Sequence, residues 1–427
     1  MHWHSSFCEI CLEGEIKVEH FITEIKINEL RHLSNLTISL NSENRQNLLI
    51  TGKNGSGKTS LLLALQKYLQ SVNDGQFMTL IHYEIPNLLK AKSILDGNLA
   101  GEERFEAEQN YLERLVQVQR YQDGVDIVFN YSEDLESLYM QGGFITAFFP
   151  ADRKTHIARA DGAENIKLEY HYDINANPGR LLHKYMVHLK TQQSYARNEG
   201  DMENVDRNQK WFDRFVDALR ILLDDSTITL EYDYKEYNFK IHEHGRKPFG
   251  FDMLSDGYSS LIHIVSDIIL RMEQNWLLGN SLSKYDVEGI VLIDELETHL
   301  HIGLQKKIMP FLTKFFPGIQ FIVTTHSPYI LNSVSNAKAY DLERHMELQN
   351  LSIYSSDGLA EGYFEADGYS DELKEKFKRY KHLKGIDGLS EAERAERAKL
   401  RSELKNIPGE LFMEAKDEFE IIEGVHL

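Results

Sequence analysis

The stretch that decides the fold is TGKNGSGKTS, residues 51–60. It fits the pattern G-x-x-x-x-G-K-[ST] from Gly52 to Thr59, directly after a short apolar run at residues 48–50. Leucines at helical spacing follow over residues 59–69, so a strand, a glycine-rich turn and a helix stand in succession. Backbone amides in such a turn surround phosphate groups, and the helix dipole adds positive potential there. The pattern therefore predicts a nucleotide site in preference to an ordinary glycine-rich turn.

The side chains of this loop have separate expected roles in binding ATP with Mg²⁺. Lys58 is expected to reach the β- and γ-phosphates, and the Thr59 hydroxyl is expected to ligate Mg²⁺. The remaining contacts are expected from the backbone and small side chains of Gly52, Asn54, Gly55, Ser56, Gly57 and Ser60.

A second motif, GIVLIDELETHLH at residues 289–301, places two carboxylates after an apolar run. Residues 290–293 are predicted to form a buried strand that ends at Asp294 and Glu295. We expect Asp294 to hold Mg²⁺, directly or through water, and Glu295 to orient and deprotonate the attacking water. An apolar strand ending in Asp-Glu is common by chance, so the motif gains its weight from the phosphate loop.

Two further motifs complete the pattern. FIVTTHSPYIL at residues 321–331 predicts a strand that presents His326, a side chain able to sense the γ-phosphate; the alternative is a histidine with a purely structural role. LSDGYSS at residues 254–260 places Ser255 and Gly257 at a helix start, where backbone amides form an anion site. The alternative there is an ordinary helix cap.

In this order the motifs resemble the ABC-ATPase superfamily, over residues 22–70 and 250–335. The resemblance implies an α/β fold: an ABC-ATPase head with a mixed sheet flanked by helices, a helical insertion and a helical C-terminal extension. In that family the signature serine contacts the γ-phosphate held by the opposite subunit. Ser255 thus implies a homodimer that closes on two ATP molecules, alone or within a larger assembly.

The phrase INELRHLSNL at residues 27–36 resembles the first strands of the chromosome-maintenance and RecF-like branch of this superfamily. The resemblance implies a nucleotide contact for Arg31. The glutamine loop of the family has no clear counterpart. Its expected region is FFPADRK at residues 148–154, with Asp152 and Arg153 as polar candidates and a solvent-exposed turn as the alternative.

The signature LSDGYSS and the segment IDELETHLH are similar to those of bacterial anti-phage ATPases, including OLD-like proteins. In that comparison Glu297, His299 and His301 fall on the loop that faces the second subunit, and Ile302 replaces the usual proline. OLD-like proteins carry a metal-dependent nuclease after the head. No second cluster of metal-binding side chains follows His326 in this sequence, so any nuclease is expected to be a separate protein.

The resemblance extends to the ATPase subunit of the Septu defence system, which accompanies an HNH nuclease, and next to that of the PARIS system. It implies an ATP-hydrolysing subunit that senses infection and controls a separate nuclease effector, with nucleic acid contacted through the complex. Two alternatives stay open. One is a RecF-like repair ATPase that clamps DNA directly, and the other is a scaffold in which ATP is structural.

Composition limits the partners. The chain has 427 residues and a formal charge of -20, from 47 basic and 67 acidic residues, so it does not coat DNA with its whole surface. No apolar run is long enough to span a membrane, no secretory signal is evident, and the two cysteines provide no disulfide framework, which favours the cytoplasm. Cys8 and Cys11 stand near His2 and His4; a loose terminal extension is favoured over a zinc site.

The expected organisation has five parts. They are an N-terminal extension (1–20), ATPase lobe I with the phosphate loop (21–83), a helical insertion that also carries strands (84–250), lobe II (251–345) and a C-terminal extension for partner or oligomer contacts (346–427). The strands predicted besides those above lie at 22–29, 35–40, 125–131, 144–149, 228–234, 237–242 and 319–324. Further helices are predicted over 84–120 and over 180–223, the latter as two helices separated by the stretch 193–208. A helix is also predicted from the LSDGYSS segment to about residue 274, another at 303–315, and more over the last sixty residues.

Two predicted helices carry stripes with two interpretations each. Arg180, Lys184 and His188 share one helical face, which either meets phosphate or is the solvated side of an amphipathic helix. A stripe near the C-terminus, made of Leu373, Phe377 and Tyr380, either docks an effector or packs on the chain's own core. After this stripe, Ser390 and Glu393 are predicted to form a capping box.

Overall fold

The computed structural model describes residues 19–153, 157–278, 287–348, 351, 359, 371–386, 388–406 and 419–423. The chain forms two compact units, Met1–Ile353 and Tyr354–Leu427. The predicted nucleotide motifs all lie in the first unit. Cys8, Cys11, His2 and His4 fall outside the described residues.

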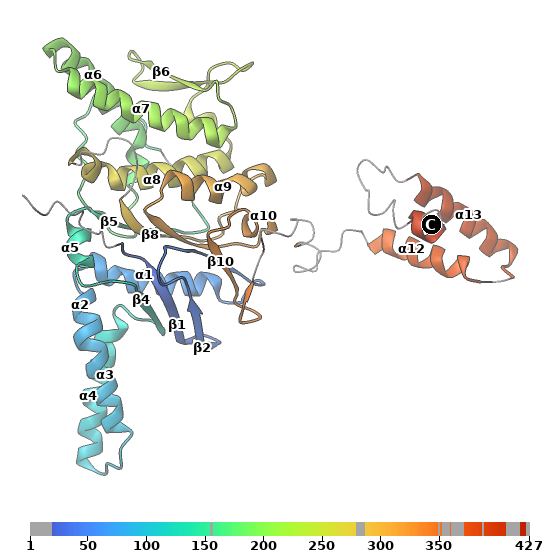
Figure 1. The fold of residues 1–427 in the computed structure, drawn as a ribbon, viewed down its shortest axis with the longest axis horizontal. Helices are drawn as coiled ribbons and strands as arrows, with labels where there is room; N and C mark the ends of the chain where they lie inside the picture. The colour runs from blue at the N-terminus through green and yellow to red at the C-terminus, as the bar shows by residue number, and fades with distance from the viewer. Residues whose placement is uncertain are drawn as a thin grey trace, which may run out of the picture. The chain divides into compact units, whose positions relative to one another are not determined.

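A mixed six-stranded sheet lies at the centre of the first unit, with strand order β11-β10-β3-β9-β8-β5 (Figure 1). In that order the strands are Met346–Leu348, Ala337–Asp341, Asn47–Thr51, Ile319–Thr324, Glu288–Ile293 and Phe144–Phe149. All neighbours from β10 to β5 pair in parallel, and β11 pairs antiparallel to β10. The strands predicted at the nucleotide motifs are present; β10 and β11 have no counterpart among the predictions.

Helix α1 (Lys58–Asn73) lies between this sheet and a second, antiparallel sheet of order β2-β1-β4 (Figure 1). The second sheet consists of β1 (Ile22–Leu30), β2 (Leu33–Ser39) and β4 (Val125–Phe129). Leucines within about 100° of one another on α1 are fully buried in the resulting core: Leu61, Leu62, Leu65 and Leu69. Each such side chain contributes about 1.5–3 kcal/mol by burial, so the core holds the phosphate loop at the start of α1.

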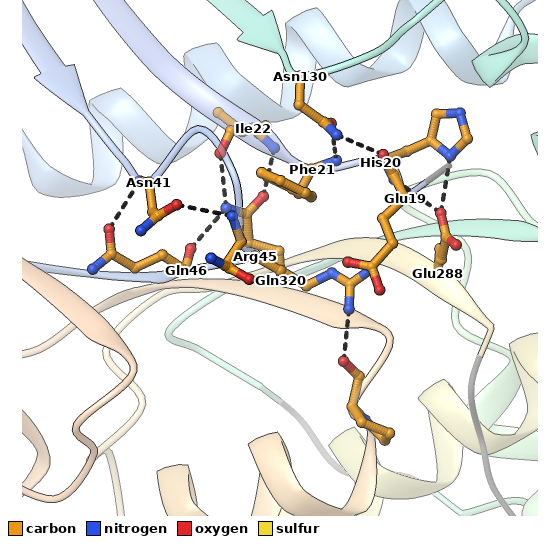
Figure 2. Close-up of polar contacts among 12 residues, drawn as sticks. Glu19, His20, Phe21, Ile22, Asn41, Arg45, Gln46, Asn130, Glu288 and Gln320 are labelled. Atoms are coloured by element: carbon orange, nitrogen blue, oxygen red, sulfur yellow. Dashed lines mark hydrogen bonds and ion pairs between the residues drawn. The ribbon is translucent and has the colours of Figure 1, made fainter. Parts of the chain in front are cut away.

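The side chain of Gln320 joins the two sheets (Figure 2). Its Oε1 accepts a hydrogen bond from the Ile22 amide at 2.7 Å, and its Nε2 donates to the Ile22 carbonyl at 3.0 Å. The same Nε2 donates to the carbonyl of Gln46 at 2.7 Å. Gln320 is fully buried in β9, and its side chain satisfies backbone groups of Ile22, at the start of β1, and of Gln46, just before β3.

Beside it, the buried imidazole of His20 lies between two carboxylates. Nδ1 is 2.9 Å from Glu288 Oε2, as Figure 2 shows, and Nε2 is 2.7 Å from Asp134 Oδ1. Burial by itself lowers the pKa of His20, but the hydrogen bonds to both carboxylates and their charges raise it above its ordinary value overall. The entrance to β1 is thus tied to β8, the strand that leads to Asp294.

A helical layer covers the other face of the six-stranded sheet (Figure 1). It contains α6 (Leu182–Glu199), α7 (Met202–Leu223), α8 (Asp256–Leu278) and α9 (Ile302–Phe315), with the hairpin β6 (Thr229–Asp233) and β7 (Asn238–His242). Shorter turns of helix are α5 (Leu135–Met140), α10 (Pro328–Leu331), Pro178–Leu181 and Phe251–Met253. In the described part of the chain, no helix is both long and apolar enough to cross a membrane.

The break predicted over residues 193–208 is wrong. Helix α6 continues to Glu199, and α7 begins at Met202. The separation is made by Gly200, which takes the left-handed conformation (φ 78°), and by Asp201, whose side chain accepts from the Asn204 amide as the N-cap of α7. Local capping therefore decided the boundary, whereas the polar composition of the longer stretch did not.

The helical pattern predicted over residues 84–120 is confirmed, and two helices occupy it. They are α3 (Ile85–Leu95) and α4 (Glu102–Gln119), which pack side by side as a projecting hairpin (Figure 1). The turn between them contains Gly97 and Gly101, the latter at φ 59°. Two shorter helical turns, Phe77–Thr79 and Leu80–Glu84, connect the hairpin to α1.

Two buried polar side chains anchor α8. Arg271 pairs with Asp267 at 2.5 Å and donates to the carbonyls of Thr146 and Asp173, each at 2.9 Å. Two residues further along α8, Glu273 accepts hydrogen bonds from Tyr185, at 3.1 Å, and from Trp211, at 3.0 Å.

The second unit has its own small core. Helices α12 (Asp371–Lys384) and α13 (Glu391–Lys405) enclose the buried side chains of Phe377, Tyr380, Leu404 and Phe419. Because the predicted stripe of Leu373, Phe377 and Tyr380 packs here, its interpretation as an effector-docking surface is wrong. The capping box of Ser390 and Glu393 is confirmed.

The environment of Glu273 makes the stability of the fold depend on pH. Burial raises the pKa of Glu273 to about 8, from 4.5 in an unfolded chain. The raised value stabilises the folded state at low pH, and that contribution is lost as the pH rises from 4.5 towards about 8. Glu273→Gln keeps an acceptor without the ionisation, so its Tm should fall less than that of the wild type between pH 6 and pH 9, by on the order of 5 °C.

Thermal unfolding followed by circular dichroism at both pH values measures this difference. Glu199→Gln, on an exposed glutamate at the end of α6, is the matched control and should follow the wild type. Parallel pH profiles for wild type and Glu273→Gln would contradict the assignment.

Candidate nucleotide site

The site lies along one edge of the six-stranded sheet, where neighbouring parallel strands end. The phosphate loop follows β3, His326 follows β9, Asp294 and Glu295 follow β8, and Arg153 follows β5. Adjacent parallel strands are about 4.8 Å apart, so their carboxyl ends bring these segments together. The sequence predicted the motifs separately; the strand order β3-β9-β8-β5 is what assembles them.

Two glycines give the phosphate loop its shape. Gly55 and Gly57 have φ angles of 86° and 99°, in the region that favours glycine. A Cβ at Gly57 would lie 2.9 Å from the Leu33 side chain, because the turn between β1 and β2 approaches the loop closely. Nearby, the Ser56 hydroxyl oxygen is buried and has no hydrogen-bond partner among the described residues, which fits a loop shaped to hold a polar ligand.

Lys58 stands at the first position of α1, with its ammonium group inside the loop. Nζ donates to the carbonyls of Gly52, at 2.8 Å, and Lys53, at 3.0 Å. Burial lowers the pKa of Lys58, against the opposing charges of Glu295 and Asp294. A largely buried cation among carbonyl dipoles is suited to receive phosphate oxygens.

Asp294 is the centre of a chain of short hydrogen bonds. Thr59 Oγ1 donates to Asp294 Oδ2 at 2.9 Å, and Thr324 Oγ1 donates to Asp294 Oδ1 at 2.6 Å. Thr324 Oγ1 in turn accepts the Glu295 amide at 2.7 Å. Hydroxyl and carboxylate oxygens are the hard ligands that Mg²⁺ prefers, so Thr59 and Asp294 fit the predicted metal position.

A cavity of about 190 Å³ opens at these groups. Its lining consists of Arg31, His32, Asn54, Gly55, Gly57, Lys58, Thr59, Ser60 and Glu295. Arg31 thus lies beside the phosphate loop as the resemblance implied. His32, the next residue, was not predicted, although its place in the same β-turn is the signal that indicates it.

Several contacts fix the backbone conformation of Glu295. Its φ is 45°, an unusual value for a non-glycine residue, and the Thr298 hydroxyl lies 3.4 Å from Oε2. Arg153 fixes the same segment, because Nη1 donates to the Asp294 carbonyl at 2.6 Å and Nη2 to the Glu295 carbonyl at 3.1 Å. Strain of this kind persists when surrounding contacts over-determine it, as here.

Arg153 also contacts α8, the helix that begins within the LSDGYSS segment: its Nε donates to Ser260 Oγ at 3.0 Å. Burial lowers the pKa of its guanidinium, against the charge of Asp294. Arg153 is therefore enclosed and bonded, whereas its neighbour Asp152 is exposed. Of the two candidates in this segment, Arg153 is the one the structure places at the site.

The backbone amide of His326 donates to Glu297 Oε1 at 2.5 Å. Burial lowers the pKa of the imidazole, and the charge of Lys58 lowers it further. His326 is consequently neutral near pH 7 and suited to exchange hydrogen bonds. The charges of Lys58, Asp294 and Glu295 are close enough to affect the pKa of His326, but His326 does not line the cavity of the phosphate loop.

Ser255 lies away from the phosphate loop of its own chain. It lines a different cavity of about 510 Å³, together with Leu223, Glu243, Arg246, Lys247, Phe249, Met253, Leu254 and Tyr258. Gly257 is packed against the loop that follows the carboxylates, where a Cβ would collide with the His299 carbonyl oxygen. The signature therefore adjoins the Asp-Glu loop but does not complete the nucleotide site within one chain.

The cavity at the phosphate loop is smaller than another cavity of the same unit. A cavity of about 630 Å³ lies on the other side of Arg153, lined by Arg153, Ile157, Arg159, His183, Asn238, Phe251, Asp252, Leu254, Asp256, Ser259 and His299. It contains no phosphate-loop residue. The smaller cavity is the candidate site because it combines the glycine-rich loop, the cation and the carboxylates.

Two members of the predicted basic stripe of Arg180, Lys184 and His188 contact Glu164. Lys184 Nζ pairs with Glu164 at 2.9 Å, and His188 Nδ1 lies 3.2 Å from the Glu164 carbonyl oxygen. The third member, Arg180, is exposed. The structural interpretation of this stripe is therefore favoured over a phosphate-binding one.

The described residues contain no group of three or more histidine, cysteine or acidic side chains arranged to hold a metal ion. The pair formed by Thr59 and Asp294 has a different composition, with one hydroxyl and one carboxylate. Such a pair fits an ion that takes its other ligands from phosphate and water. Besides His32, a site residue that the sequence did not indicate is Thr324, whose hydroxyl links two adjacent strands.

Curated relatives share parts of the sequence. Septu protein PtuA of Bacillus mycoides (strain KBAB4) is 25% identical over 387 residues, which cover 87% of this chain and 48% of that protein. Retron Ec83 probable ATPase of Escherichia coli is 41% identical over 90 residues, covering 21% of this chain and 16% of the relative. Septu protein PtuA of Bacillus thuringiensis is 35% identical over 85 residues, which cover 20% of this chain and 22% of that protein. The chain thus spans about half the length of the first relative and less of the others.

Solved structures include an Smc head bound to the C-terminal winged-helix domain of ScpA. It superposes with a TM-score of 0.36 at 11% identity, covering 75% of this chain and 94% of that one.

A family model matches residues 48–332, about two thirds of the chain, from the strand before the phosphate loop to just beyond His326. The matched region contains the phosphate loop, the LSDGYSS segment, Asp294, Glu295 and His326. The chain belongs to the family described as "AAA domain, putative AbiEii toxin, Type IV TA system".

Proposed function

We propose that this chain is the ATP-binding and hydrolysing subunit of a bacterial anti-phage defence system and that it controls a separate nuclease effector. The observation that carries the ATPase assignment is the hydrogen-bonded series Thr59, Asp294, Thr324 and Glu295 beside Lys58. Family membership and relatives named as Septu proteins and retron ATPases support the defence role. The net charge of -20 favours this role over direct clamping of DNA.

In the proposed reaction, Lys58 and the amides of the phosphate loop hold the triphosphate of ATP. Bound Mg²⁺, held by Thr59 and Asp294, would neutralise charge on the phosphates. Glu295, at the cavity wall, orients water and takes its proton. His326, neutral at physiological pH, provides a hydrogen bond near the γ-phosphate.

The site is proposed to be completed by a second copy of the chain. Ser255 and Gly257 of one subunit would face the nucleotide of the other, because the signature serine opens onto a cavity separate from the phosphate loop of its own chain. ATP binding thereby becomes coupled to dimer closure, and closure is the event that an effector can detect.

The effector is proposed to be an HNH-type nuclease, from the resemblance to the Septu ATPase subunit. Contact with nucleic acid would occur through the complex, in the cytoplasm. Co-purification of the chain with the product of a neighbouring nuclease gene tests this part of the proposal. A chain that purifies without that product, even from cells containing both, would contradict it.

Lys58→Ala should weaken binding of ATP with Mg²⁺ at least about tenfold, because the triphosphate loses the cation enclosed by its loop. Isothermal titration calorimetry on the purified chain measures the affinity. Lys67→Ala, on the same helix but without contact to the loop, is the matched control. Unchanged affinity in a folded Lys58→Ala protein would rule out the phosphate loop.

Glu295→Gln should retain ATP binding and lower the rate of hydrolysis on the order of a hundred-fold. The bonds from Thr59 and Thr324 to Asp294 do not involve the Glu295 side chain, so the metal position survives the change. Phosphate release and ATP affinity, measured on the same preparation, separate the two effects. Normal turnover would transfer the role of base to another group, with His326 the first to test.

Lys58→Ala and Ser255→Arg should each inactivate the homodimer, and mixing the two proteins should restore part of the ATPase activity. Each mixed dimer then contains one site with an intact loop and an intact signature. Native mass spectrometry identifies mixed dimers in the same sample. Mixed dimers without any restored activity would show that each chain works alone.

A further inference from the structure

The helical hairpin of α3 and α4 projects from the first unit (Figure 1). Its base is held in the main core by buried side chains on both sides, namely Phe77, Leu80, Val118 and Tyr121. Beyond this base the hairpin contacts no other element extensively, and most of α4 is exposed. An 18-residue helix such as α4 is about 27 Å long, so the free portion is a substantial surface.

Helix α4 has apolar side chains on two faces. One face packs against α3 and contains Tyr111, Leu115 and Val118. On the outer face, Phe105, Leu112 and Val116 are 62%, 44% and 65% exposed. At 100° per residue these three side chains lie within about 40° of one another, so they form a continuous stripe. A packed hairpin does not need this second stripe for its own stability.

The two helices carry opposite charge beside their exposed apolar groups. On α4, Glu108 and Glu113 flank the outer stripe on either side, about 60° and 80° away. On α3, Lys90 and Lys92 flank Leu89, which is 61% exposed. In the described part of the chain, these four charged side chains make no ion pair or hydrogen bond.

We propose that this hairpin binds the same hairpin of a second copy of the chain. In a two-fold contact, the acidic outer face of α4 from one copy meets the basic face of α3 from the other, and the reciprocal contact is identical. Phe105, Leu112 and Val116 are then covered together with Leu89 of the partner. Each copy supplies both halves of the complementary pair, which is the requirement for an isologous interface.

The charge pattern argues against other occupants. Nucleic acid and anionic membranes would be repelled by the glutamates beside the stripe. A basic partner protein could cover α4, but it would leave the lysines of α3 and Leu89 uncovered. Only a partner with both an acidic and a basic apolar face satisfies the whole hairpin, and this chain has both.

The proposed contact goes beyond ATP-dependent dimerisation, because the hairpin contains none of the residues of the nucleotide or signature cavities. It should form without nucleotide and persist in Lys58→Ala. Together with the ATP-dependent interface, it gives each chain two self-association surfaces and allows assemblies larger than a dimer.

A charge swap in the full-length chain tests the proposal. Glu108→Lys with Glu113→Lys, and separately Lys90→Glu with Lys92→Glu, place like charges at both contacts of each homodimer. Each double variant should self-associate at least about tenfold more weakly than the wild type without nucleotide. An equimolar mixture restores opposite charges at both contacts, so it should recover association to within about threefold of the wild type.

Sedimentation velocity without nucleotide measures association, at low and high salt. Glu199→Lys with Asp206→Lys changes the net charge equally on α6 and α7 and should associate as the wild type does. Recovery in the mixture also proves that both variants are folded. The proposal is overturned by a nucleotide-free wild type that stays monomeric, by unchanged association of either double variant, or by failure of the mixture to recover association. Each of these results leaves the ATPase proposal intact, because that proposal is tested by nucleotide binding and hydrolysis.

Discussion

The carboxylate of Asp294 is the group on which the arrangement of the site depends. It accepts from Thr59 at the start of α1 and from Thr324 at the end of β9, while its own backbone continues β8. One buried side chain thus sets the distance between the phosphate loop and two strand ends. Because a buried carboxylate left without these partners would cost several kcal/mol, the three segments are stable only together.

The elements around Asp294 serve to keep this edge of the sheet rigid. Arg153 binds the carbonyls of Asp294 and Glu295 and also contacts Ser260 on α8. Helix α8 is in turn fixed by the buried pair of Arg271 and Asp267. Arg153 thus connects α8, which begins at the predicted signature, to the backbone of Glu295, so the proposed subunit-facing surface and the proposed catalytic carboxylate are joined through one guanidinium group.

The sequence predicted those features that local pattern determines. The phosphate loop, the strand ending at Asp294 and the strand before His326 each have a signature within about a dozen residues, and each is present. Thr324 and Gln320 act through contacts more than twenty-five residues away along the chain, and no local signal marks such partners. Strand β10 was missed for the same reason, since its pairing with β3 joins residues far apart in sequence.

Helix boundaries, by contrast, are set by single residues, and the average composition of a longer stretch predicts them poorly. Gly200 and Asp201 separate α6 from α7 inside a stretch whose polarity predicted a wide break. Gly101, at a positive φ, likewise lies in the turn that divides the helical stretch at 84–120 into α3 and α4. That turn folds the segment back on itself, so the lysines of α3 and the glutamates of α4 are carried by two packed helices of one projection. The hairpin shares no residue with the cavity at the phosphate loop, so the proposed assembly surface and the proposed nucleotide site can be regulated independently.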